Sequence, residues 1–165
     1  MDITLGQITV TSAAKPNAPS QGGGTARQST ELTLSQARAR SPFPFAEPSY
    51  IPSGFDFADA AVVESPATLI VLSYASPSGP NFTLVEAPLN QYKLGPDGKR
   101  RYLVVADSIE EASISGAPAA RAQQDARPGG PVALGFIWED GGRLNHIIGL
   151  GLSESELARI AASTS

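Results

Sequence analysis

Residues 132–149, VALGFIWEDGGRLNHIIG, carry the clearest structural signal in the chain. Two runs of apolar and β-branched residues, 132–139 and 143–149, flank Asp140-Gly141-Gly142. A glycine-containing turn between two such runs is a strong short-range signal of a β-hairpin. Side chains alternate along a strand, so Phe136 and Trp138 share one face and Ile137 takes the other. The segment therefore predicts an antiparallel hairpin, from which the rest of the fold can be worked outward.

Further strands are predicted before this hairpin. The run 69–75 (LIVLSYA) is almost continuously apolar, which is typical of a strand in the middle of a sheet. Residues 82–87 follow a turn at 76–81, and residues 101–106 follow a turn at 95–98. Strands are also predicted over 55–63 and 91–94, and a weak pair of short strands over 113–115 and 118–123. In the first of these, the alternation places four side chains on one face: Phe55, Phe57, Ala61 and Val63.

Two short helices are expected from their capping signals. Thr33 and Gln36 form a capping-box pattern that predicts a helix over 34–40, which Pro42 ends. Ser153 and Glu156 form a second such pattern, which predicts a helix over 153–162. Its apolar stripe is short, so its stability must come from docking on the sheet.

The N-terminal third is organised differently. Residues 1–12 predict one strand, in which the alternation changes phase at Gly6-Gln7; this indicates either a β-bulge or a strand buried first on one face and then on the other. Residues 13–32 are rich in Pro, Gly and Ser and predict a flexible linker. Residues 33–165 then form a single domain. Together the elements predict an α+β fold with a mostly antiparallel sheet.

Four prolines define a segment, residues 42–55, that we call the strap. Each proline lacks the backbone N–H that a sheet ladder needs, so the segment is not a central strand. Its sequence, PFPFAEPSYIPSGF, interleaves the prolines with aromatic bulk. We expect it to lie in extended geometry across an apolar surface.

Composition excludes several classes of function. The chain has 165 residues, no cysteine, one histidine and a net charge of −4. Disulfides, iron–sulfur clusters and zinc sites are therefore excluded or nearly so, and nucleic acid is not an expected partner. No apolar run approaches the roughly 18 residues of a membrane span, and no basic-then-apolar leader opens the chain. The chain itself is expected to be soluble.

No motif predicts catalysis, a cofactor or a metal. His146 is the single imidazole, and no G-x-S-x-G sequence accompanies it. Residues 148–152 imitate a dinucleotide fingerprint, but Glu154 stands where the third glycine belongs and would repel a pyrophosphate. We therefore expect a non-enzyme with no catalytic, cofactor-binding or metal-binding residues. A hydrolase that uses His146 is the lesser alternative.

Several segments resemble a known family. The strap reads Pro42-Phe43-Pro44-Phe45 and then Pro48-Ser49-Tyr50-Ile51-Pro52-Ser53-Gly54-Phe55; Ile114-Ser115-Gly116-Ala117-Pro118-Ala119 follows in the middle, and the Trp138 hairpin with its capped helix closes the chain. These features resemble the bacterial extracytoplasmic domain of unknown function found C-terminal in anti-sigma-factor-like and lipoprotein-like envelope proteins, itself similar to lipoprotein-sorting folds. The resemblance covers about residues 33–164. It implies a strongly curved, half-barrel-like sheet with helices on the concave side.

The resemblance also implies a function. It indicates a non-enzymatic, extracytoplasmic sensory or binding module, close to a membrane through an anchor that this chain does not contain. Its partner is expected to be a lipid or another apolar ligand, or an envelope protein. An alternative is a structural module that pairs with another chain through the edge strand 3–10. Trp138 is either a core plug or part of a ligand cleft. The predicted ligand-face residues are Phe45, Tyr50, Phe57, Tyr74, Phe136 and Trp138.

Overall fold

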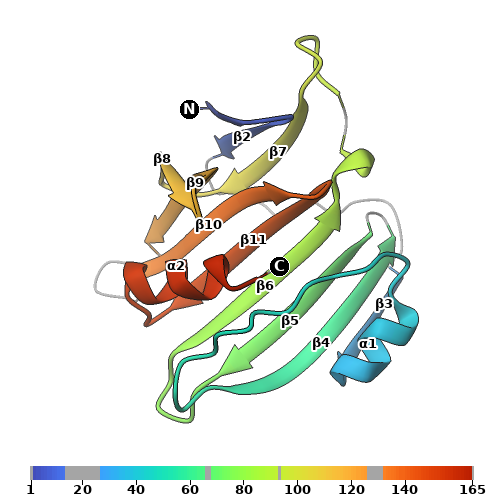
Figure 1. Ribbon diagram of the computed structural model, residues 1–165, viewed down its shortest axis with the longest axis vertical. Helices are drawn as coiled ribbons and strands as arrows, with labels where there is room; N and C mark the ends of the chain where they lie inside the picture. The colour runs from blue at the N-terminus through green and yellow to red at the C-terminus, as the bar shows by residue number, and fades with distance from the viewer. Residues whose placement is uncertain (1, 14–26, 66–67, 93, 126–131, 165) are drawn as a thin grey trace.

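The computed structural model describes residues 2–13, 27–65, 68–92, 94–125 and 132–164. Within them the fold is α+β and mainly β, with two helices and mostly antiparallel strands (Figure 1). An eight-stranded sheet runs in the order β3-β4-β5-β6-β11-β10-β9-β8, and a three-stranded sheet runs β1-β2-β7. The described strands β3 and β8 stand at opposite ends of the large sheet, so no closed barrel is formed by this part of the chain.

The large sheet is antiparallel throughout. Its strands are β3 (Arg27–Leu32), β4 (Asp56–Ser65), β5 (Leu69–Ala75), β6 (Asn81–Pro88), β8 (Ser108–Ile114), β9 (Ala117–Asp125), β10 (Val132–Asp140) and β11 (Arg143–Leu150). The predicted interior strand 69–75 is confirmed, since β5 pairs with β4 on one side and β6 on the other. The pair predicted weakly at 113–115 and 118–123 is longer than expected, and both its strands belong to this sheet.

The predicted hairpin at 132–149 is confirmed. β10 and β11 pair from Ala133 opposite Leu150 to Asp140 opposite Arg143, which leaves a two-residue loop. Both loop residues have positive φ, 57° at Gly141 and 82° at Gly142. A two-residue loop of this type matches the right-handed twist of its strands only with positive φ at both positions, which is why glycines stand here.

The hairpin is buried on both faces. Five consecutive residues of β10, Leu134 to Trp138, and four of β11, Leu144 to Ile147, are all buried. Successive side chains of a strand point to opposite faces, so each face of this part of the sheet must be covered by another layer. Phe136 and Trp138 belong to one core cluster, whereas Ile137 belongs to a second cluster on the other face.

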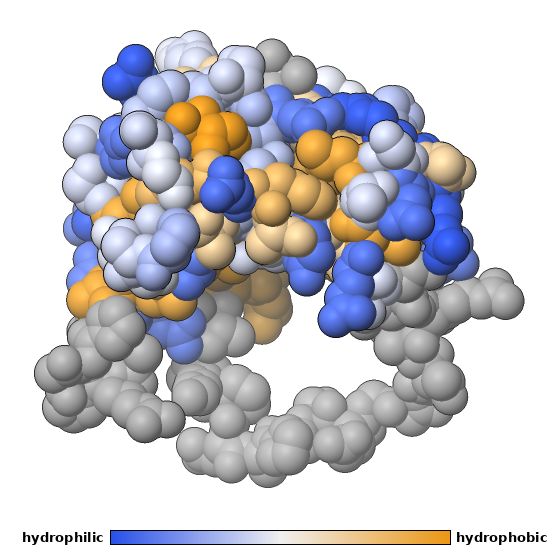
Figure 2. Space-filling model, turned by 90° about the horizontal axis from the view of Figure 1, so that it is seen from below, coloured by the Kyte–Doolittle hydropathy of each residue, from blue (hydrophilic) through white to orange (hydrophobic). Residues whose placement is uncertain are grey.

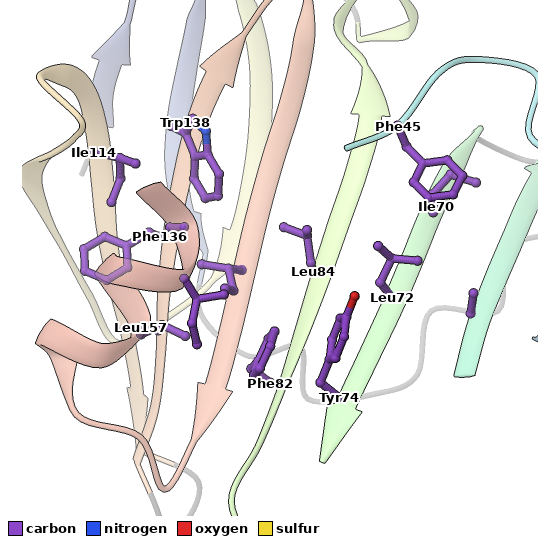
Figure 3. Close-up of a cluster of buried hydrophobic side chains, with 14 of the residues drawn as sticks. Phe45, Ile70, Leu72, Tyr74, Phe82, Leu84, Ile114, Phe136, Trp138 and Leu157 are labelled. Atoms are coloured by element: carbon purple, nitrogen blue, oxygen red, sulfur yellow. The ribbon is translucent and has the colours of Figure 1, made fainter. Parts of the chain in front are cut away.

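The strap and helix α2 (Glu154–Ala162) cover the first face. In Figure 1 the strap crosses in front of β4 to β6, and α2 lies over β10 and β11. Leu157 and Ile160 of α2 are fully buried in the same cluster as Phe45 of the strap. The hydroxyl of Ser153 accepts the N–H of Glu156, so the predicted cap begins this helix. Figure 3 shows the cluster that the two covers enclose.

Helix α1 (Leu34–Arg40) is also confirmed. Thr33 and Gln36 form both hydrogen bonds of the predicted capping box. Ala37 is fully buried against the first core cluster. Arg38 places its guanidinium 4.7 Å from the Phe45 ring centroid and forms an ion pair with Glu47, so α1 holds the beginning of the strap.

The small sheet covers the second face. Its strands are β1 (Asp2–Leu5), β2 (Ile8–Ala13) and β7 (Arg100–Val105), with β2 and β7 parallel. The single strand predicted over 1–12 is wrong, because the phase change at Gly6-Gln7 is a turn between two strands. Gly6 has φ 57°, and the turn lets both strands bury their apolar side chains on the same side. Those side chains are Ile3, Leu5, Ile8 and Val10.

Three further predictions differ from the structure. The end of the predicted linker, 27–32, is strand β3, while 14–26 lie outside the described residues. The predicted strand 91–94 is replaced by a 3₁₀ turn, η1 (Leu89–Gln91), and one isolated bridge from Leu94 to Arg100. In β4 the register shifts between Phe57 and Asp59. After the shift, successive side chains point to the faces opposite to those predicted. Ala60 and Val62 are therefore buried, rather than the predicted Ala61 and Val63.

Removing a buried side chain from the small sheet tests whether it is an integral layer. Ile8 is fully buried in the second core, so Ile8→Ala is expected to lower the free energy of unfolding by about 2–5 kcal/mol. Leu103 of β7 is 65% exposed, and Leu103→Ala serves as the control, with a change within about 0.5 kcal/mol. Urea unfolding followed by circular dichroism measures both. Equal stability of the two variants would contradict the packing described.

Candidate functional site

The six predicted ligand-face residues do lie together, but in the interior. Phe45, Tyr74, Phe136 and Trp138 are between 2% and 6% exposed and belong to the first core cluster. Tyr50 and Phe57 are partly buried against it. Figure 3 shows four of these side chains enclosed with leucines and isoleucines of the sheet. The structure therefore places them in a covered core rather than along an open ligand face.

Ring packing fills this core closely. Tyr74 stacks on Phe82 with centroids 4.8 Å apart, and Phe57 meets Tyr74 edge-on at 5.6 Å. Such aromatic pairs add stabilisation beyond their buried area. Seen from below, the molecule shows apolar residues at the surface only in patches separated by hydrophilic ones (Figure 2).

The strap and α2 hold each other closed. Pro48 and Thr164 form an isolated antiparallel β-bridge, and the N–H of Tyr50 donates to the Ser163 hydroxyl at 3.0 Å. The Tyr50 hydroxyl donates to Glu156 at 2.7 Å. The guanidinium of Arg159 lies 4.1 Å from the centroid of the Tyr50 ring. Tyr50 thus serves as a contact between the two covers.

A buried carboxyl group ties the strap to the sheet. Oε1 of Glu86 on β6 accepts the Ala46 N–H at 2.8 Å and the Arg143 guanidinium at 3.2 Å. Oε2 is buried with no hydrogen-bond partner among the described residues. Burial raises the pKa of Glu86 from 4.5 to about 7. The hydrogen bond from Ala46 and the charge of Arg143 lower this pKa, but their effect is smaller than that of burial. Sequence reasoning missed this group, although Glu86 continues the core-facing alternation of Phe82 and Leu84.

An open groove runs beside Trp138 on the first face. It has a volume of about 320 Å³ and lies between the β8–β9 turn, the end of β10 and the last turn of α2. Ile114, Ala117 and Ala162 supply apolar wall, and Ser115 and Asp140 supply polar groups. The Trp138 side chain is 3% exposed. Among the described residues the indole N–H has no protein acceptor, and its nitrogen is not one of the fully buried polar atoms that lack a partner.

A histidine–tyrosine pair lies on the second face. Nδ1 of His146 is 2.8 Å from the Tyr102 hydroxyl, and the two rings meet edge-on with centroids 5.7 Å apart. Burial lowers the pKa of His146 from 6.5 to about 4, and burial raises the pKa of Tyr102. Both groups are therefore neutral at pH 7. The sequence identified His146 as the single imidazole but did not indicate this partner.

Comparison of the chain with protein-family models, curated proteins and solved structures finds no match. The resemblance drawn from the sequence therefore stays a prediction. Across the described residues, no helix has the length and apolar character needed to span a membrane. No group of three or more potential metal ligands is found among these residues either.

The buried carboxyl group gives a pH-dependent stability that one substitution removes. The folded state favours protonated Glu86, so this residue contributes stability that is fully present below pH 4.5 and is lost as the pH rises through about 7. Its full contribution is about 3 kcal/mol. His146 acts in the opposite sense, with stability present above pH 6.5 and lost as the pH falls through about 4.

Glu86 and His146 change the free energy of unfolding in opposite directions as the pH falls. The pH dependence of the wild-type protein alone therefore reveals neither contribution. Glu86→Gln keeps an oxygen acceptor for the Ala46 N–H but does not titrate. We expect the free energy of unfolding of the wild type, relative to this variant, to rise by about 3 kcal/mol between pH 8 and pH 4.5. Urea unfolding at four or five pH values measures it. A difference that stays constant with pH would show that Glu86 is ionised normally in the folded protein.

Proposed function

We propose that the chain is a non-enzymatic binding and sensory module of a bacterial envelope protein that works outside the cytoplasm. The family resemblance supports this role, including association with anti-sigma-factor-like or lipoprotein-like chains. A strongly curved, half-barrel-like form of the large sheet is part of the same proposal. The lack of a catalytic motif in the sequence is consistent with it.

The observation that carries a binding role is the indole N–H of Trp138. The nitrogen is not fully buried, so water in the open groove accepts its hydrogen bond, and a bound molecule would have to replace that water with an acceptor of its own. The groove of about 320 Å³ beside the indole gives such a molecule room. The site thus favours a ligand that combines a hydrogen-bond acceptor with apolar bulk.

The chemistry of the groove favours a peptide segment of an envelope partner over a plain acyl chain. A peptide carbonyl would accept the Trp138 N–H, and an apolar side chain would contact Ile114 and Ala162. Backbone N–H groups of the peptide would donate to the Ser115 hydroxyl and to the Asp140 carboxylate, which already accepts from Arg143, whereas an acyl chain has no donor for either. The peptide is therefore the occupant to which the proposal commits.

The single tryptophan of the chain makes the test specific. Acetylated tripeptide amides with a central Leu are titrated into ¹⁵N-labelled protein, and the indole ¹H–¹⁵N signal is followed. We expect a saturable downfield shift of the proton. Ala162→Phe places a ring at an exposed groove position and should abolish the shift, whereas Ser155→Phe, exposed on the first turn of α2, should not. Decanoate tests the lipid alternative.

Each outcome of this titration either supports or overturns the peptide proposal. A saturable shift with peptide that Ala162→Phe removes supports the peptide proposal. A shift with decanoate alone makes the groove a lipid site and overturns the peptide proposal. No shift with either probe, or an equal shift in Ala162→Phe, overturns a binding role for the groove.

The two alternative functions fare differently. Assembly through residues 3–10 loses most of its basis, because β2 already pairs with β1 and with β7 in its own sheet. Among the described strands, the outer edge of β1 has no partner in this sheet and stays open to another chain. The hydrolase alternative needs a general base with a pKa near the working pH, whereas burial lowers the pKa of His146 to about 4.

A further inference from the structure

A second cavity lies on the opposite face of the large sheet from the Trp138 groove. Its volume is about 50 Å³, and it sits between β7 and the strands β9, β10 and β11. Val104 and Ala106 line it from the β7 side, and Gly135 and Ile148 line it from the large sheet. Ile137 pairs with His146, and Trp138 points to the other face, so the two sites are separated by the sheet itself.

His146 presents an unused ring nitrogen to this cavity. The side chain is 8% exposed, and its Nδ1 is occupied by the Tyr102 hydroxyl at 2.8 Å. Nε2 has no hydrogen-bond partner in the described ranges of the chain. A Cβ built on Gly135, which also lines the cavity, would lie 3.3 Å from Nε2. The free nitrogen is therefore directed toward the space beside Gly135.

Glycine at this wall of the cavity lets the β11 backbone and the His146 ring approach β10 closely. Gly135 stands inside a strand of large apolar residues, where glycine gives up both packing and conformational entropy. Any side chain there would begin 2.9 Å from the Ile147 carbonyl oxygen and 3.3 Å from Nε2 of His146. Glycine inside a strand is typical of a position where a backbone or ligand approaches closely.

The size and the electrostatics of the cavity define its ligand. A single water needs roughly 10–15 Å³ of the same measure, so about 50 Å³ holds a molecule of only a few heavy atoms. The walls are apolar apart from His146 and the glutamines 123 and 124. The walls offer an ion no opposite charge, because neither the imidazole nor an amide is charged at neutral pH.

We propose that this cavity is a binding site for a small neutral molecule with a short apolar part and one hydroxyl or amide group, which hydrogen-bonds to Nε2 of His146. Tyr102 positions the ring: its hydroxyl occupies Nδ1 and leaves Nε2 for the ligand. The apolar part contacts Val104 and Ile148. This site is independent of the Trp138 groove, and either can fail without the other.

The single histidine allows a direct test. Two-bond ¹H–¹⁵N spectra of the imidazole are recorded while 1-propanol, acetamide or sodium acetate is added at constant pH and ionic strength. We expect a saturable shift of the Nε2 signal with 1-propanol and acetamide, little shift with acetate, and a smaller effect at Nδ1. Backbone amide signals of helix α1, which packs on the first core cluster, serve as the internal control and should stay unchanged.

Two variants close the cavity in different ways. Gly135→Ala fills it from the strand, and Ala133→Leu fills it from a half-buried lining position, which guards against a folding defect in the first. Each should weaken binding by about tenfold or more, as surplus methyl groups do in an apolar pocket. Val132→Ala, at a 44% exposed neighbour, should bind like the wild type.

The outcomes are again decisive. Saturable binding of 1-propanol or acetamide that both cavity-filling variants weaken supports the site. A linear shift that never saturates, an equal response to acetate, or unchanged affinity in folded Gly135→Ala and Ala133→Leu overturns it. If none of the three probes changes the Nε2 signal, the cavity holds only water, and the proposed binding site is also overturned.

Discussion

The β10–β11 hairpin needs cover on both of its faces, and the rest of the structure follows from this requirement. Nine of its residues in two unbroken runs are buried, so neither face can be left to solvent. The strap and α2 cover one face, and the small sheet covers the other. Cover for two faces explains why segments as distant as residues 3–10 and 153–162 pack against the same pair of strands.

Local signals predicted local structure well. The turn at Gly141-Gly142 and both helix caps depend on residues within four positions of each other, and all of them are where the sequence placed them. Long-range arrangements were missed. The parallel pairing of β2 with β7 joins segments about ninety residues apart, and the register shift in β4 depends on its pairing with β5. Such features are set by tertiary packing, which a single sequence expresses only weakly.

The same distinction applies to the candidate sites. Aromatic bulk at Phe45, Tyr74 and Phe136 predicted an apolar face, but the bulk of a residue does not tell whether a face is covered. The strap and α2 decide that, through contacts such as Tyr50 with Glu156. The residues that point to binding and pH dependence are polar residues at buried positions of a strand. Glu86 ties the strap to β6, and His146 lines a cavity with a ring nitrogen that has no partner among the described residues. Buried polar groups of this kind are where binding and pH dependence are to be sought.

Residue-resolved hydrogen exchange in low urea tests the requirement for two covers most directly. If the small sheet is an integral layer, backbone amides of β2 and β7 will exchange only through global unfolding, with the same free energy and urea dependence as amides of β10 and β11. The contrary result is separate exchange of β2 and β7 through a low-energy opening that leaves β10 and β11 protected. The hairpin would then be stable with one covered face, and the requirement for cover on both faces would be wrong.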